Sequence, residues 1–173
     1  ARIELNVESA TYDLENNSNN FSAQGFPAID YMLYGIESDS NLVINKYQSI
    51  DGYKYTNYLS SLINQMISNT DQIIKYWQTD RDDFISSTGN TATSSLNKLT
   101  NDFIYYYEKG FRANKIGIPG GVFSSVYTDK VEAYFRKNIS KRLALEALKA
   151  IKAFYNGESF VDGTSGESLK TYI

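Results

Sequence analysis

Apolar side chains recur at spacings of three, four and seven residues in three stretches of the chain, the pattern of amphipathic helices. We predict helices near 51–79, 93–110 and 140–155. The apolar positions that define them are Tyr55, Leu59, Leu62, Ile63, Met66, Ile73, Ile74 and Trp77, then Leu96, Leu99, Phe103, Tyr106 and Tyr107, and last Leu143, Ala147, Leu148, Ile151, Phe154 and Tyr155. Strand-like alternation is nearly absent. The pattern therefore predicts an all-α fold, an antiparallel helical bundle, in a single domain over residues 1–173.

The stretches before the first long helix are shorter. Residues 1–24 are polar and rich in asparagine, which predicts a loop with weak local structure. Pro27 is suited to a first helical turn and Gly35 to the position after a helix end, so we predict a short helix from Pro27 to Tyr34.

Two breaks are expected further along the chain. A brief helical turn near 81–87 should lead into a loop at 86–90, and the helix at 93–110 should end near Gly110. Between 113 and 127, three glycines and a proline fall within the seven residues from Lys115 to Gly121, which predicts a fixed, irregular loop.

Composition narrows the classes of function. With 17 basic and 20 acidic residues and a net charge of -3, the chain offers no electrostatic surface for nucleic acid. No apolar run approaches the roughly 20 residues of a transmembrane helix. The absence of histidine and cysteine removes the ligands that dominate zinc sites, so no zinc is expected. A small ligand, a cation or another protein remain as partners.

One segment carries a family resemblance. Gly25-Phe26-Pro27-Ala28-Ile29-Asp30 resembles the G-x-H-x-x-E signature of the imelysin-like family, with Pro27 in place of the histidine and Asp30 in place of the glutamate. Gly117-Ile118-Pro119 resembles a second stretch of that family. The resemblance implies a helical bundle in a bacterial protein of the cell envelope, periplasmic or lipid-anchored as a lipoprotein, with links to iron uptake. Because the family is longer and both ends look cut, we expect this chain to be a fragment.

Asp30 is the candidate metal ligand. In the family signature, two possible metal ligands lie three residues apart on one helical face, but the ring of Pro27 has no lone pair to offer a metal. Asp30 could still give oxygen ligands to iron or calcium. The alternative is that Asp30 caps a helix or forms a salt bridge while Pro27 starts a helix.

Tyrosine is unusually frequent, at 15 of 173 residues. Buried tyrosines ordinarily anchor packing through their rings. The alternatives are an aromatic wall for a ligand, or phenolate and carboxylate coordination of ferric iron. Tyr31 and Tyr34 are the preferred residues for the second alternative, because they follow Asp30 directly.

These residues combine into one predicted site. The short helix would pack against the glycine-rich loop, and the ligand-binding residues would be Gly25, Pro27, Asp30, Tyr31, Tyr34, Ile118, Pro119 and Gly120. No catalytic residue is assigned. We predict a binding or uptake accessory protein of the envelope, for iron or another cation, without peptidase activity. The alternatives are a residual metallopeptidase and a surface module that binds a protein or a glycan.

Overall fold

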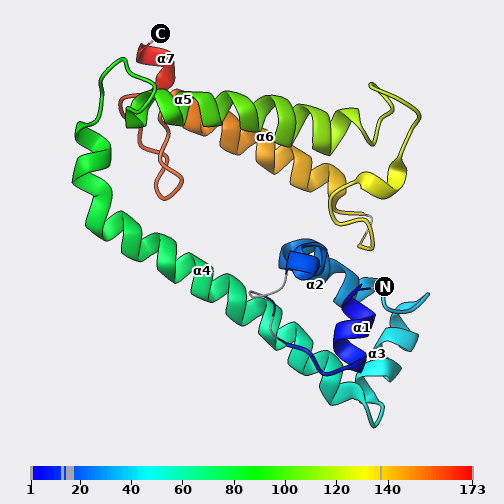
Figure 1. Cartoon of the computed structure of the whole chain (residues 1–173). Helices are drawn as coiled ribbons and strands as arrows, with labels where there is room; N and C mark the ends of the chain where they lie inside the picture. Colours follow the sequence, from blue (N-terminus) through cyan, green and yellow to red (C-terminus); the bar gives the residue numbers. More distant parts are fainter. Residues whose placement is uncertain (1, 13, 15–17, 137, 173) are drawn as a thin grey trace. The chain divides into compact units, whose positions relative to one another are not determined.

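The computed structural model describes residues 2–12, 14, 18–136 and 138–172, which fall into two compact units (Figure 1). Unit 1 contains the described residues up to Arg81 together with Phe135 and Arg136, and unit 2 contains those of 82–134 and 138–172. The all-α prediction is confirmed: among the described residues the only strand-like pairing is one isolated bridge, between Glu158 and Ser165. That the two units together make a single domain stays a prediction.

Unit 1 gathers several short helices on the first part of a long one. They are α1 (Arg2–Glu8), the 3-10 helix η1 (Ser18–Ala23), α2 (Gly25–Tyr34), α3 (Ser40–Gln48) and the start of α4 (Gly52–Ser86). Their shared core is Ile3, Val7, Leu14, Ala23, Ala28, Met32, Tyr58 and Leu62. The predicted loop at 1–24 is therefore wrong over α1 and η1. The spacing of four residues between the apolar Ile3 and Val7 was the one sign of helix α1 in the sequence. A helix of 7 residues is too short to show a sustained apolar period.

A buried hydrogen-bond network fixes α1 against α4. The Asn6 side-chain amide donates to the Tyr58 hydroxyl at 3.1 Å and to Asn20 Oδ1 at 3.1 Å. The Tyr58 hydroxyl in turn donates to the Ala23 carbonyl at 3.0 Å. Because Tyr58 and Asn20 are fully buried, each of these polar groups needs the partner it has.

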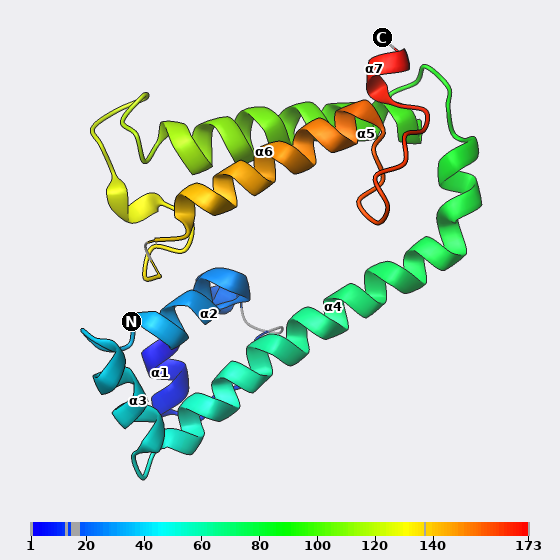
Figure 2. The same ribbon diagram turned by 180° about the vertical axis from the view of Figure 1, so that it is seen from behind.

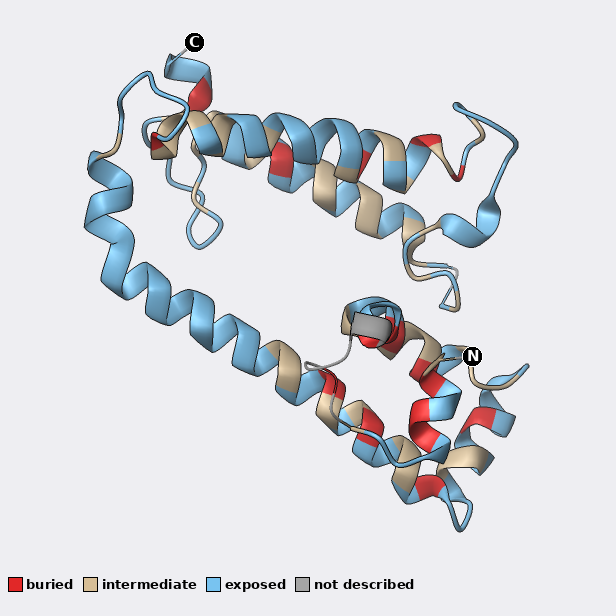
Figure 3. Cartoon of the chain, viewed as in Figure 1, coloured by how far each residue is buried: buried red, intermediate tan, exposed pale blue. Residues whose placement is uncertain are grey.

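The buried residues of α4 lie in its first half. Leu62 is buried, whereas every residue from Ile67 to Ser86 is exposed, and Figure 3 shows the change in burial along the helix. The predicted helix at 51–79 is confirmed in its start and extends further than expected, to Ser86. The separate turn predicted at 81–87 is wrong, because Arg81 to Ser86 simply continue α4.

Unit 2 is a helical hairpin closed by loops. Its elements are α5 (Ser95–Tyr105), the π-helix η2 (Tyr106–Gly117), the 3-10 helix η3 (Thr128–Lys130), α6 (Ser140–Asn156) and α7 (Leu169–Tyr172). The continuous rod of α5 and η2 lies beside α6 in both views (Figures 1 and 2). The buried apolar residues of unit 2 include Phe111, Ile151 and Leu169. The helix predicted at 140–155 is confirmed, and it ends at Gly157 in the left-handed conformation.

The helix predicted at 93–110 does not end near Gly110. The backbone widens into η2 and runs on to Gly117, so the expectation of irregular structure from residue 113 is also wrong. The irregular segment starts later and is fixed by main-chain bonds, including Val122 N–H to the Gly117 carbonyl at 2.8 Å. Gly121, at φ +75°, could not carry a side chain, because a Cβ would lie 2.9 Å from Val126 Cγ2.

Across the described part of the chain, no helix combines the length and the apolar character needed to cross a membrane.

Candidate functional site

Helix α2 carries five of the eight predicted ligand-binding residues. Gly25 opens the helix at φ +68°, and Pro27 lies in its first turn, where a missing N–H breaks no helical bond. The Pro27 ring is exposed. The helix ends at Gly35, as predicted, and it buries Ala28 and Met32 against the unit 1 core. This burial fixes the face of the helix on which Asp30 and its neighbours lie.

The Asp30 carboxylate binds main chain from a distant part of the sequence. Its two oxygens accept hydrogen bonds from Phe135 N–H at 2.9 Å and from Arg136 N–H at 3.0 Å. The carboxylate is half-buried. Such charge-assisted bonds to backbone amides are stronger than neutral ones, so Asp30 holds the 135–136 segment on α2. Asp30 thus has a structural role, as in the alternative to metal binding that the sequence analysis left open.

The two tyrosines of α2 also have partners. The Tyr31 hydroxyl donates to the Glu4 carboxylate of α1, and its ring meets Phe135 edge-on at 5.0 Å between centroids. The Tyr34 ring lies 4.9 Å from the Arg136 guanidinium carbon, a cation-π distance. We call Asp30, Tyr31, Tyr34, Phe135 and Arg136 the α2 anchor. Every α2 side chain proposed as an oxygen ligand belongs to it.

The electrostatics of Tyr31 oppose a phenolate. Burial raises the pKa of Tyr31 well above its ordinary value, and the hydrogen bond to Glu4 and the Glu4 charge raise it further. A raised tyrosine pKa means that the neutral phenol is favoured in the folded protein. Coordination of ferric iron through this oxygen would first have to overcome that preference.

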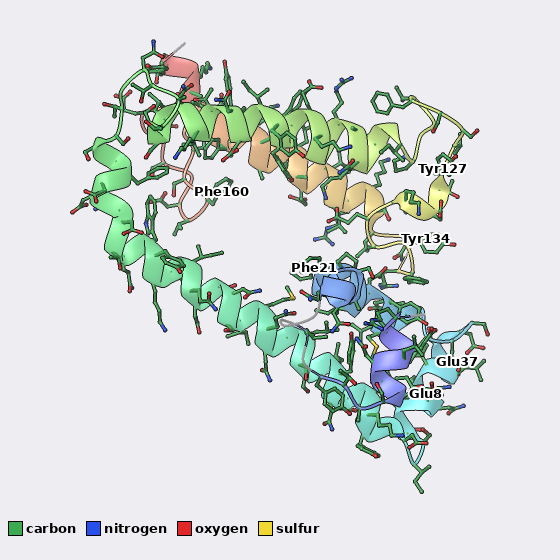
Figure 4. All side chains as sticks on the ribbon, in the orientation of Figure 1. Glu8, Phe21, Glu37, Tyr127, Tyr134 and Phe160 are labelled. Carbon is green, nitrogen blue, oxygen red and sulfur yellow. The ribbon has the colours of Figure 1, made fainter. Side chains whose placement is uncertain are left out.

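The other three predicted residues lie in unit 2. Ile118 follows the end of η2 and is half-buried, Pro119 is buried, and Gly120 is exposed. Ile118 also lines an open groove of about 420 Å³ with Asn114, Tyr127 and Lys130; Tyr127 is labelled in Figure 4. Since α2 belongs to unit 1, the predicted packing of the two segments stays a prediction.

Sequence reasoning missed Glu4, Phe135 and Arg136. Glu4 was missed because α1 was not expected. The other two carry no local signal, because the turn in which they lie contacts α2 only in the folded chain. Within the described residues, no group of three or more acidic side chains is placed to hold a metal ion.

The comparisons agree with the resemblance read from the sequence. The sequence profile of the imelysin family matches residues 2–173. Searches of curated proteins and of solved structures found no match. Because the match covers nearly the whole chain, this chain belongs to the imelysin family.

Proposed function

We propose that this member of the imelysin family is a binding or uptake accessory protein of the bacterial cell envelope without peptidase activity. The observation that supports this proposal is what Pro27 and Asp30, the two altered positions of the family signature, do in the structure. The side chain of Pro27 has no atom that can coordinate a metal, and both oxygens of Asp30 accept hydrogen bonds from main-chain amides of residues 135 and 136. The signature segment thus serves to fix the fold. Its envelope location rests on the family resemblance.

The chemistry of a metallopeptidase demands more than this segment offers. A catalytic zinc site needs three protein ligands and an open position for water, and the usual ligands are imidazole, thiolate and carboxylate. The chain has no imidazole and no thiol. A residual peptidase would therefore depend on carboxylates alone.

The test is a cleavage assay on the purified chain. A panel of fluorogenic peptides is incubated with added zinc and with EDTA, and we expect no cleavage that EDTA abolishes. The double variant Pro27→His with Asp30→Glu restores the signature side chains and should stay inactive, because further ligands are still missing. Cleavage that is lost in EDTA and regained with zinc would refute the proposal.

A narrower form of this proposal is that the bound ligand is a cation. Iron or calcium at Asp30, Tyr31 and Tyr34 would use oxygen ligands suited to hard cations. Such an ion would have to replace the bonds of Asp30 to residues 135 and 136, which argues for a ligand other than a cation at this position. Calorimetric titration with Ca²⁺ and Fe³⁺, on the wild type and on Asp30→Asn, decides between the two. Stoichiometric binding that Asp30→Asn removes would establish the cation site.

A surface module for a protein or a glycan is the second candidate function. The observation in its favour is the run Tyr105, Tyr106 and Tyr107, whose side chains are 68%, 44% and 39% exposed. Exposed aromatic rings are common anchors in recognition surfaces. Glycan-array binding that Tyr105→Ala and Tyr106→Ala abolish would support this function.

A further inference from the structure

Unit 2 contains an open groove whose lining includes no residue of the α2 anchor. It has a volume of about 530 Å³, and its walls come from α5, η2, α6 and α7. We call it the α5–α6 groove, and its lining residues are Phe103, Ile104, Tyr107, Glu108, Leu148, Ile151, Lys152, Tyr155, Asn156 and Lys170. Pockets for small molecules usually measure about 300–1,000 Å³ and combine apolar walls with a few polar groups. The groove has the size and composition of a small-ligand site.

The floor and walls are apolar and set by packing. Ile151 is buried beneath the groove, and the Phe103 ring stacks on Phe154 at 5.4 Å between centroids. Ile104 and Tyr107 form part of the opposite wall and remain 54% and 39% exposed. Covering these side chains with a ligand would remove apolar surface from water, which is favourable.

The acidic and basic residues of the groove differ in whether their charges are paired. Glu108, the only acidic residue among the described lining residues, accepts a hydrogen bond from Arg112 Nε at 2.7 Å, so its charge is already compensated. Lys152 and Lys170 form no ion pair with any other described residue. Lys152 lies near the C-terminal end of α6, and α7, which carries Lys170, is held to unit 2 by the buried Leu169. Two ammonium groups that have no ion pair among the described residues therefore line one apolar groove.

The backbone is unusual along the same wall. Phe103 and Ile104 are the last groove residues of α5, and Tyr107 and Glu108 belong to the first turn of η2. The groove thus spans the point at which the helix changes from α to π geometry. Segments of π-helix are rare and occur frequently at functional sites.

We propose that the α5–α6 groove binds a small amphipathic carboxylate, with its apolar body against Ile104, Tyr107 and Ile151 and its carboxylate near Lys152 and Lys170. The apolar walls select a hydrocarbon or aromatic body, and the two ammonium groups select a negative head over a neutral or positive one. This inference rests on the proposed binding function and gives it a site and a ligand class.

The test uses three ligands with the same chain and different heads: decanoate, 1-decanol and decylammonium. Each is titrated into the purified protein by calorimetry, the two ionic ligands below their range of micelle formation and decanol below its solubility limit. We expect decanoate to bind at one site, decanol about tenfold more weakly, and decylammonium more weakly still, since a hydrogen bond to a charged group contributes about one order of magnitude in affinity.

Matched variants locate the site. Lys152→Gln and Lys170→Gln should each weaken decanoate binding several-fold and leave decanol binding unchanged. Ile104→Gln should weaken both ligands, because it removes an apolar wall without opening the core. Lys98→Gln changes an exposed lysine of α5 that does not line the groove, and it should match the wild type.

Three results would overturn the proposal: no saturable decanoate binding, equal affinity for all three heads, or equal losses in Lys98→Gln and the groove variants. None of these concerns peptide cleavage. Chelator-sensitive cleavage would refute the proposed function instead, so the two failures can be told apart.

Discussion

Replacing Asp30 by alanine removes the hydrogen-bond acceptor that fastens residues 135 and 136 to α2. The structure has the carboxylate accepting from two main-chain amides at 2.9 and 3.0 Å. In Asp30→Ala these amides must turn to water, and the Phe135 ring loses the support that sets it against Tyr31. Asp30→Asn is a milder variant for comparison, because its amide oxygen can still accept one of the two bonds.

The size of the effect follows from the two bonds. A hydrogen bond to a charged group contributes about 1.5–3 kcal/mol, and a half-buried acceptor belongs at or below the lower end. We therefore expect Asp30→Ala to lower the free energy of unfolding by about 2–3 kcal/mol and Asp30→Asn by about half as much. For a chain of this length, about 1 kcal/mol shifts the melting temperature by about 2–4 °C. The alanine variant should thus melt roughly 4–12 °C lower.

The assay is urea and thermal unfolding followed by circular dichroism at 222 nm. Asp71→Ala, at an exposed position of α4, is the matched control and should change stability by less than about 0.5 kcal/mol. The reasoning would be refuted if Asp30→Ala melted with the wild type. If the same variant had also lost cation binding, Asp30 would be a ligand and not an anchor.

Three further predictions concern other parts of the fold. Tyr58→Phe removes the hydroxyl's two buried hydrogen bonds, with the Asn6 amide and the Ala23 carbonyl, and should cost about 1–3 kcal/mol in urea unfolding, whereas Tyr53→Phe, at an exposed position, should have no effect. Gly157→Ala should destabilise more than Gly163→Ala, because both have positive φ but only at Gly157 would a Cβ meet a carbonyl, at 2.7 Å; equal losses in thermal unfolding would contradict this. Burial raises the pKa of Tyr47 to about 12, above its unfolded value of about 10. The contribution of neutral Tyr47 to the free energy of unfolding is therefore complete below pH ~10 and is lost as the pH rises towards 12. In urea unfolding at alkaline pH, Tyr47→Phe should reduce this dependence of stability on pH.

The helices of this chain could be predicted where a periodic apolar face was long. The segment 140–155 was placed within a residue of α6, because its apolar face is long and Gly157 ends it. The helix at 93–110 was cut short because Gly110 was taken as a stop. In the folded chain Gly110 lies inside η2, where a Cβ would lie 2.8 Å from the Tyr106 ring and that ring would have to shift.

The candidate site could be predicted only in part. Local chemistry was enough to select the α2 segment and to offer anchoring as one role for Asp30. It could not identify the partners, because residues 135 and 136 are separated from Asp30 by more than a hundred residues. The groove of unit 2 was equally hidden, since Lys152 and Lys170 look like ordinary solvated lysines until α6 and α7 are folded together.

The bond between Asp30 and Phe135 also constrains the order of folding. It closes a loop of 105 residues, and the entropic cost of such a closure is about 4 kcal/mol, more than the two hydrogen bonds return. The link therefore forms only after other contacts have drawn the chain together. During synthesis at about 5–20 residues per second, α2 waits roughly 5–20 s for its anchoring segment to be made. In that interval α2 is held by the unit 1 core and by the hydrogen bond from Tyr31 to Glu4, without the bonds that Asp30 later forms with residues 135 and 136.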